Sequence, residues 1–273
     1  MTGEQPSYGE VKPSPPLVPY VQCYWSITAA SAPPVLNRIC PDGCADIIVD
    51  LSATLAMGGA PGVGRCYAVG TMLRAARIPL AGIIHLLGVR FRPGAAGPIF
   101  GLPMHELTDR TAPLPDLWGE ATDLGPCLAE APTHSDRVAR LERFLLARLR
   151  RVREPAPVVR QAIRFVARTG GTRSVRELEQ VVGLGGRHLE RHFRDAVGIS
   201  PKSFARVIRF RRALAAMQQS ATIPWSRLAA EAGYYDQAHL IREVRALADV
   251  TPTGLAAELR RVGSVQYETN VPE

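Results

Sequence analysis

The sequence contains few cysteines and no long hydrophobic run. Its five cysteines are an odd number without a dense framework, which favours reduced thiols over a disulfide scaffold. The longest apolar stretches, such as residues 83–89, are too short to cross a bilayer. The first ten residues lack the basic and apolar regions of a signal peptide. We therefore expect a cytoplasmic globular protein that does not contact the membrane.

Motifs for metal and catalytic chemistry are also missing. Six histidines are scattered through the chain, and neither H-x-H nor HExxH occurs. Cys40 and Cys44 are separated by three residues, which is not the spacing of a zinc C-x2-C pair. A buried free cysteine is the commoner explanation for such residues. We expect no cofactor, no metal and no enzyme activity, and a thiol- or metal-responsive site is kept as an alternative.

Charge is unevenly divided along the chain. Residues 1–150 hold 13 basic and 13 acidic side chains, whereas residues 151–273 hold 20 and 12. The net charge of +8 therefore lies entirely in the second part, where nearly all basic residues are arginine. A basic module joined to a neutral one indicates one half that binds a polyanion and one half with another task. A chain of 273 residues is long enough for two such domains.

The first part alternates short apolar runs with Gly and Pro turns. The segments "PDGCADIIVDL", "YAVGTM" and "AGIIHLLGVRFRP" are predicted strands, and "GAAGPIFGLP" is a predicted short helix closed by Gly101. The passage "LTDRTAPLPDLWG" is predicted to be a loop. Many short strands without helical periodicity are typical of barrels and sandwiches. We expect a mainly-β, barrel-like domain.

A helical pattern begins at Ser135. Val138, Leu141, Leu145 and Leu149 fall three or four residues apart and form one apolar face. This face either packs on the first domain or forms a seam between two copies. The sequence "EPAP" then ends the helix, because proline disfavours helix in the residue before it. The expected parts are 1–134 for the mainly-β domain, 135–157 for the helix and linker, 158–262 for an all-helical domain and 263–273 for a tail.

The helical part contains a repeat. Its first unit has a short helix opened by the capping box Ser174 and Glu177 and ended by Gly183. A second helix follows, and then a long helix that begins with Ser200-Pro201. The same order returns 50 or 51 residues later, ending at Thr251-Pro252. Two short helices joined by a glycine turn form a helix-turn-helix, whose second helix lies in the major groove of DNA.

A single such helix pair is often an ordinary helical hairpin. Duplication, arginine on both second helices and the whole charge surplus together favour DNA binding. The stretches "HLERHFRDAVGISPKSF" and "LAAEAGYYDQAHLIREVR", the latter followed by "VTP", resemble the two signature regions of the AraC/XylS family of transcription regulators. The segments "PDGCADII", "GVRFRPGAA" and "LPMHELTDR" look like the sensor domains of that family, often described as cupin-like barrels.

The resemblance implies an α+β multidomain fold, with a cupin-like sheet domain followed by a DNA-binding domain of two helix-turn-helix units. Three features depart from the family pattern. Gly185 and Gly186 stand where a side-chain N-cap is usual, and Val244 replaces a phenylalanine. Asp249 replaces a turn glycine, and aspartate adopts the left-handed conformation at some cost.

The residues expected to contact DNA lie opposite the apolar faces of the two second helices. They are Arg187, Glu190, Arg191 and Arg194 in the first unit, and Gln237, His239, Arg242 and Arg245 in the second. Arginine suits guanine, glutamate suits cytosine and glutamine suits adenine. For each of them, base readout and phosphate contact both stay open, since much of the hydrogen bonding to DNA goes to phosphate. Contact with the DNA backbone, or a plain solvated position, is expected for Arg194, Lys202, Arg206, Arg209 and Arg245.

The resemblance also implies partners for both domains. Double-stranded promoter or operator DNA is expected at the helical domain, and RNA polymerase and a second copy of the chain are further expected partners. A small-molecule effector is expected at the first domain, where Trp25, Cys44, Asp46 and Arg90 are candidates. Core or ion-pair roles are the simpler explanation for these four. An alkyl-DNA repair methyltransferase is a second alternative, but the cysteine spacing does not supply its zinc-type cluster.

Overall fold

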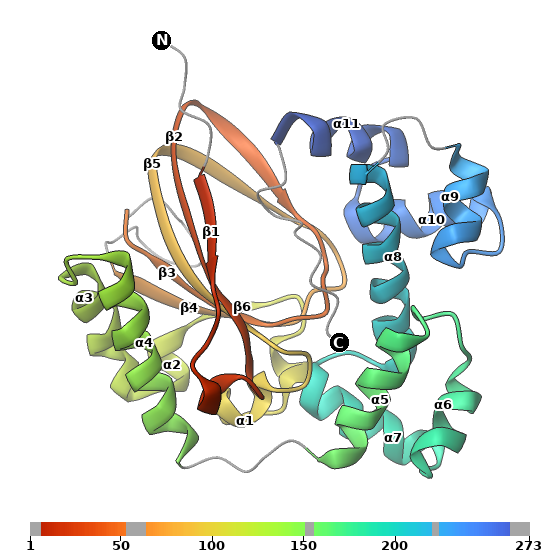
Figure 1. Cartoon of the computed structure of the whole chain (residues 1–273), viewed down its shortest axis with the longest axis horizontal. Helices are drawn as coiled ribbons and strands as arrows, with labels where there is room; N and C mark the ends of the chain where they lie inside the picture. Colours follow the sequence, from red (N-terminus) through yellow and green to blue (C-terminus); the bar gives the residue numbers. More distant parts are fainter. Residues whose placement is uncertain (1–6, 53–63, 151–155, 220–223, 263–273) are drawn as a thin grey trace.

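The computed structural model describes residues 7–52, 64–150, 156–219 and 224–262. A sheet domain and a helical domain lie side by side (Figure 1). The expected fold class is confirmed, because an antiparallel sheet forms the first part and helices form the second. The predicted tail over 263–273 and most of the predicted linker lie outside the described residues.

The sheet has six antiparallel strands in the order β1-β2-β5-β3-β4-β6. They are β1 Ser7–Val11, β2 Val21–Ile39, β3 Asp46–Asp50, β4 Arg65–Val69, β5 Ala76–Phe91 and β6 Thr111–Pro113. The prediction of short strands was wrong for β2 and β5, which have 19 and 16 residues. Of these two strands, the sequence had predicted only the part of β5 within "AGIIHLLGVRFRP". The pairing of β2 with β5 shifts in register between Ser31 and Val35, and irregularities of this kind bend a strand pair locally.

Helices, most of them short, cover one face of this sheet (Figure 1). They are α1 Ala96–Phe100, η2 Met104–Leu107, α2 Leu114–Leu117, η3 Gly119–Asp123, α3 Leu124–Ala129 and α4 His134–Leu149, with η1 Pro15–Leu17 at the start of the chain. The loop prediction for "LTDRTAPLPDLWG" was wrong, since β6 and α2 fall within it. Their apolar residues are too few to show a period, and burial against the sheet decides their conformation.

The sequence left open whether the apolar face of helix α4 packs on the first domain or forms a seam between two copies. Leu141 and Leu145 are fully buried in the same cluster as Phe91, Phe100 and Trp118. The apolar face of α4 therefore belongs to the core of the sheet domain. Its N-terminus is capped by Thr133, whose side chain accepts a hydrogen bond from the backbone of the first turn.

The helical domain has two groups of helices joined by a long one. They are α5 Pro157–Arg168, α6 Val175–Val182, α7 Gly186–Val197, α8 Pro201–Gln219, α9 Trp225–Ala232, α10 Gln237–Ala248 and α11 Pro252–Val262. Figure 1 shows α5, α6 and α7 near one end of α8, with α9, α10 and α11 near the other. Apolar residues of all seven helices belong to one core cluster. None of the helices in the described part of the chain is long and apolar enough to cross a membrane.

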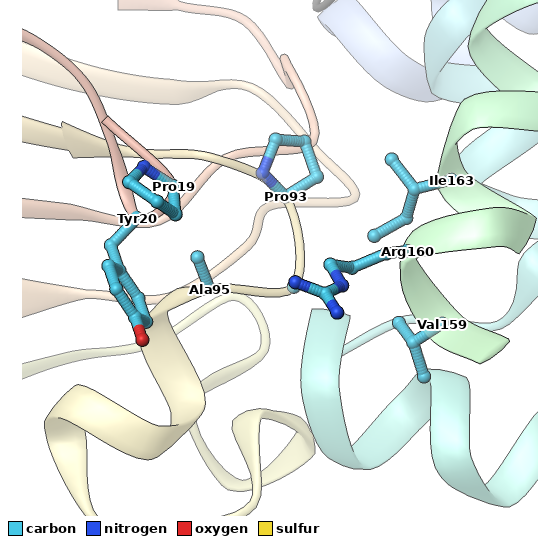
Figure 2. A pocket seen from close by; sticks show the side chains of 8 residues that line it. Pro19, Tyr20, Pro93, Ala95, Val159, Arg160 and Ile163 are labelled. Carbon is cyan, nitrogen blue, oxygen red and sulfur yellow. The ribbon is translucent and has the colours of Figure 1, made fainter. Parts of the chain in front are cut away.

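The two domains meet along several segments. A crevice at the start of α5 is one such place, lined by Tyr20, Pro93 and Ala95 of the sheet domain and by Val159, Arg160 and Ile163 of α5 (Figure 2). Gly94 approaches Ile163 so closely that a Cβ at this glycine would lie 2.8 Å from the side chain. Cys40 of the sheet domain belongs to the core cluster of the helical domain. The domains are therefore joined by packed apolar contacts.

Candidate nucleic-acid interface

The first helix-turn-helix unit consists of α6 and α7. The capping box predicted at Ser174 and Glu177 is present, with both of its hydrogen bonds. Gly183 then turns the chain in the left-handed conformation that glycine adopts without strain. The N-cap of α7 is Gly185, which is extended and offers no side-chain hydrogen bond. The backbone N–H groups at the start of α7 therefore lack a side-chain cap from this residue.

Helix α7 has an apolar and a charged face. Leu189 and Phe193 are fully buried, and the Phe193 ring lies 5.5 Å from that of Phe204 on α8. The four residues predicted for DNA contact are all exposed on the other side: Arg187, Glu190, Arg191 and Arg194. Arg191 lies 3.4 Å from Nδ1 of His188, an exposed residue that was not among the predicted contacts. The structure therefore brings the four predicted residues to one solvent-facing side of one helix.

The second unit consists of α9 and α10. Asp236 caps α10 by accepting a hydrogen bond from the backbone N–H of His239. Leu240 and Val244 are fully buried, as their spacing predicted. Three of the predicted contact residues are exposed on α10, namely Gln237, Arg242 and Arg245. At the other end, Asp249 adopts the expected left-handed conformation, with a φ of 54°.

His239 is placed differently from its neighbours on α10. Its ring is half-buried and meets the Tyr234 ring edge-on at 5.3 Å. Its Nδ1 accepts a hydrogen bond of 3.4 Å from the backbone N–H of Tyr235. These contacts turn the ring toward the glycine turn. The fully solvent-facing side chain here is Tyr235, which is 93% exposed and was not among the predicted contacts. The sequence held a signal for this exposure, because Tyr235 lies in the turn directly after Tyr234, and two adjacent aromatic residues in a turn rarely both face the core.

Two arginines of α8 have structural partners. Arg206 forms an ion pair of 2.8 Å with Glu243 of α10. Arg209 donates to the carbonyl oxygen of Gly171, and its guanidinium lies 5.9 Å from the Tyr234 ring centre. These contacts hold the second unit against α8 and the turn before α6. The sequence alone had grouped both arginines with backbone contacts or plain surface.

The four effector candidates of the sheet domain lie close together. Trp25 donates from its indole nitrogen to Asp46 at 2.9 Å, and Arg90 lies 3.5 Å from the same carboxylate. Arg90 also pairs with Asp42 at 3.3 Å, while Cys44 is buried beside them. Burial raises the pKa of the Asp46 carboxyl, and the Arg90 guanidinium acts in the opposite direction. We name this group, Trp25, Asp42, Cys44, Asp46 and Arg90, the Arg90 cluster.

The Arg90 cluster touches the helical domain. Arg211 of α8 donates to the carbonyl oxygen of Asp42 at 3.3 Å. The next residue, Gly43, has a φ of 84° and lies so close to Phe204 that a Cβ there would stand 2.8 Å from the ring. Only glycine fits such a turn without strain. A shift of the residues in the Arg90 cluster would therefore act directly on α8, because Asp42 and Gly43 contact that helix.

The cysteines lie mostly in the interior. Cys23, Cys40, Cys44 and Cys66 are buried, and burial raises the pKa of the Cys23 and Cys66 thiols to about 12. Such thiols are almost entirely protonated at neutral pH, and the thiolate is the reactive form. Across the residues whose positions are described, no three His, Cys, Asp or Glu side chains gather in a way that could hold a metal ion.

Two family models match parts of the chain. Residues 178–258 match one described as a helix-turn-helix domain, and residues 9–113 match one described as a domain of unknown function, DUF6597. No curated protein matches the sequence.

Solved structures of AraC-type regulators are similar to the chain at low identity. The C-terminal domain of AraT, a response regulator from Geobacillus stearothermophilus, is 18% identical with a TM-score of 0.36, over 38% of this chain and 87% of that one. The xylose-binding transcription activator XylR is 15% identical with a TM-score of 0.34, over 46% of this chain and 39% of its own. ToxT from Vibrio cholerae is 8% identical with a TM-score of 0.48, over 93% of this chain and 98% of its own.

Two helix-turn-helix units on either side of α8, with exposed arginines on both second helices, define a DNA-binding domain. The match over residues 178–258 agrees with this class. The domain is an AraC-type helix-turn-helix domain, and the chain is a DNA-binding transcription regulator.

Proposed function

We propose that the chain recognises a specific promoter or operator sequence through both second helices, and that a small molecule bound to the sheet domain modulates this recognition. The observation that carries the first half is the exposed face of α7, with Arg187, Glu190, Arg191 and Arg194 outside and a buried apolar face opposite. Side chains of these kinds hydrogen-bond to base edges in the major groove. On α10, Gln237 and Arg242 have the same role. Arg194 of α7 and Arg245 of α10 contact phosphate.

Binding of the full chain to duplex DNA tests the proposal. Affinity is measured for a duplex selected from a random pool and for a scrambled duplex of the same length, at several salt concentrations. We expect the selected duplex to bind more tightly by about a thousandfold or more, as specific regulators do. We also expect both affinities to fall steeply with salt, because arginines of the basic helical domain that contact phosphates release their counterions. Equal affinity for both duplexes would contradict sequence-specific recognition.

For the effector, we propose that the Arg90 cluster is the contact site. It combines an indole, a guanidinium and two carboxylates in buried or partly buried positions on β2, β3 and β5 and in the turn before β3, and it adjoins α8 through Arg211. A few polar groups set among apolar walls are the usual composition of a small-molecule site. The raised pKa of the buried thiols supports a small molecule over the thiol-responsive alternative.

Native mass spectrometry of the full chain tests the effector site. We expect an extra mass on the purified protein that is lost in the folded variant Arg90→Gln and kept in Arg92→Gln, a substitution on the same strand end. An extra mass that survives Arg90→Gln would contradict the assignment. Contact with RNA polymerase and pairing of two copies belong to the same proposal and rest on the resemblance to the family.

A further inference from the structure

The sheet domain supplies hydrogen-bond donors to the C-terminal end of α7. The last four carbonyl groups of a helix have no partner within the helix. Here the Thr71 hydroxyl donates to the carbonyl oxygen of Val197 at 2.6 Å, and the Thr108 hydroxyl donates to that of Gly198 at 2.6 Å. Thr71 is only 2% exposed, so its hydroxyl is committed to this contact. The first recognition helix is thus capped by another domain.

The C-terminal end of α10 is capped in the same way. The backbone N–H of Ala75 donates to the carbonyl oxygen of Leu247 at 2.7 Å. Arg38 donates to the carbonyl oxygen of Ala248, and Arg77 donates to that of Asp249 at 3.2 Å. Two guanidinium groups at a helix C-terminus also interact favourably with the helix dipole.

One short segment joins these two sites. Thr71 and Ala75 are four residues apart, and a chain of that length spans at most about 14 Å. The segment is itself held in shape, because the Asp109 carboxylate accepts hydrogen bonds from the backbone N–H groups of Leu73 at 2.6 Å and Arg74 at 3.3 Å. The ends of α7 and α10 are therefore tied to each other from outside the helical domain, in addition to the connection through α8.

We propose that residues 71–77, together with Arg38 and Thr108, form a brace that sets the position of one recognition helix relative to the other. The sheet domain then determines which spacing between two half-sites the protein accepts on DNA. This inference rests on the proposed function, because spacing matters only when both recognition helices contact DNA. Thr71 and Arg77 are positioning residues in this scheme and make no contact with DNA themselves.

The test uses full-length protein and duplexes in which the two selected half-sites are moved apart or together one base pair at a time. The variants are Thr71→Val, which removes the hydroxyl at nearly constant volume, and Arg77→Gln at a half-exposed side chain. Thr71→Ser restores the hydroxyl, and Arg74→Gln removes an exposed arginine from the same segment. We expect the wild type, Thr71→Ser and Arg74→Gln to share one sharp optimum. Thr71→Val and Arg77→Gln lose roughly fivefold in discrimination between neighbouring spacings, the effect of one hydrogen bond.

The outcomes separate the brace from the proposed function. An unchanged spacing profile in both Thr71→Val and Arg77→Gln would overturn the brace and leave DNA recognition intact. A loss of affinity that is equal at every spacing would also overturn it, because the contacts would then only stabilise the fold. If the wild type selects no duplex from the random pool, the proposed function fails, and the brace fails with it.

Discussion

Arg38 and Arg77 lie directly opposite each other on β2 and β5, and both guanidinium groups reach the C-terminal end of α10. Like charges at facing positions of an antiparallel pair normally repel. Here acceptors from the helical domain offset the repulsion between the two guanidinium groups. Glu258 of α11 binds Arg38 with two hydrogen bonds of 2.7 and 3.1 Å, and Asp249 pairs with Arg77 at 2.8 Å. An arginine pair that disfavours the isolated sheet thereby becomes a contact between domains.

The two arginines are predicted to differ in their effect on stability. The Arg38 side chain is 10% exposed, whereas the Arg77 side chain is 45% exposed and its partner Asp249 is 75% exposed. Arg38→Gln should lower the free energy of unfolding by about 2 kcal/mol, because it leaves the carbonyl group of the buried Ala248 and the partly buried Glu258 carboxylate without a charged donor. Arg77→Gln should cost less than about 1 kcal/mol, since its ion pair is solvated. Urea unfolding of the full chain measures both, and equal losses would contradict the prediction.

Arg191 and Arg194 should separate base readout from phosphate contact. Arg191 lies closer to the N-terminal end of α7, the part of a recognition helix that reaches base edges. Arg191→Ala should cost about 1–3 kcal/mol on the selected duplex and relax preference at one base pair. Arg194→Ala should weaken selected and scrambled duplexes equally and reduce the salt slope by about one unit. Binding titrations at two salt concentrations measure this, and equal losses of specificity would show that the face of α7 is misassigned.

A footprint should cover two successive major grooves on one face of the DNA. Helix α8 has 19 residues, which at about 1.5 Å per residue span roughly 28 Å. Successive grooves on one face are about 34 Å apart, and the two units on either side of α8 cover the difference. Hydroxyl-radical footprinting of the full chain at a concentration where single copies bind tests this prediction. Protection confined to one groove would mean that only one unit contacts DNA.

Gly88→Ala should disturb the Arg90 cluster. A Cβ at Gly88 would lie 2.0 Å from the Trp25 ring, so the indole has to leave its place and its hydrogen bond to Asp46. Overfilling of this kind costs about 1–3 kcal/mol in unfolding free energy. The matched control is Gly119→Ala, because nothing lies within 4 Å of a Cβ there. Near-ultraviolet circular dichroism and urea unfolding should change for Gly88→Ala alone, and a similar change in both variants would contradict the packing of Trp25.

His85 should make stability depend on pH. Burial, together with the charges of Arg137 and His134, lowers the pKa of His85 below its usual value. The unfolded chain therefore binds a proton at a pH where the folded chain does not, and stability is lost as pH falls below about 6.5. His85→Gln should flatten this part of the stability curve, while the same substitution at the exposed His188 serves as control. An unchanged slope in His85→Gln would show that other groups carry the pH dependence.

The sequence by itself determined the helix-turn-helix units, because their signals are local. The capping box at Ser174 and Glu177 joins residues three apart, and Gly183 supplies a left-handed turn that few other residues adopt. The spacing of Leu189 and Phe193 fixes which side of α7 is buried. The opposite side is then exposed whatever surrounds the helix, so the positions of Arg187 and Arg191 followed from the chain alone.

Only the tertiary structure decided what meets the ends of those helices. Thr71 and Val197 are 126 residues apart. No sequence pattern indicates which distant residue will donate a hydrogen bond to a carbonyl group at a helix end. Periodicity could not show that the His239 ring turns toward Tyr234, because the ring is placed by contacts across the turn and not by its position on the helix. The same holds for the Arg90 cluster, in which β2, β3 and β5 bring Trp25, Asp46 and Arg90 together through strand register. Register and domain contact depend on the whole fold, whereas caps and helical faces depend on a few neighbouring residues.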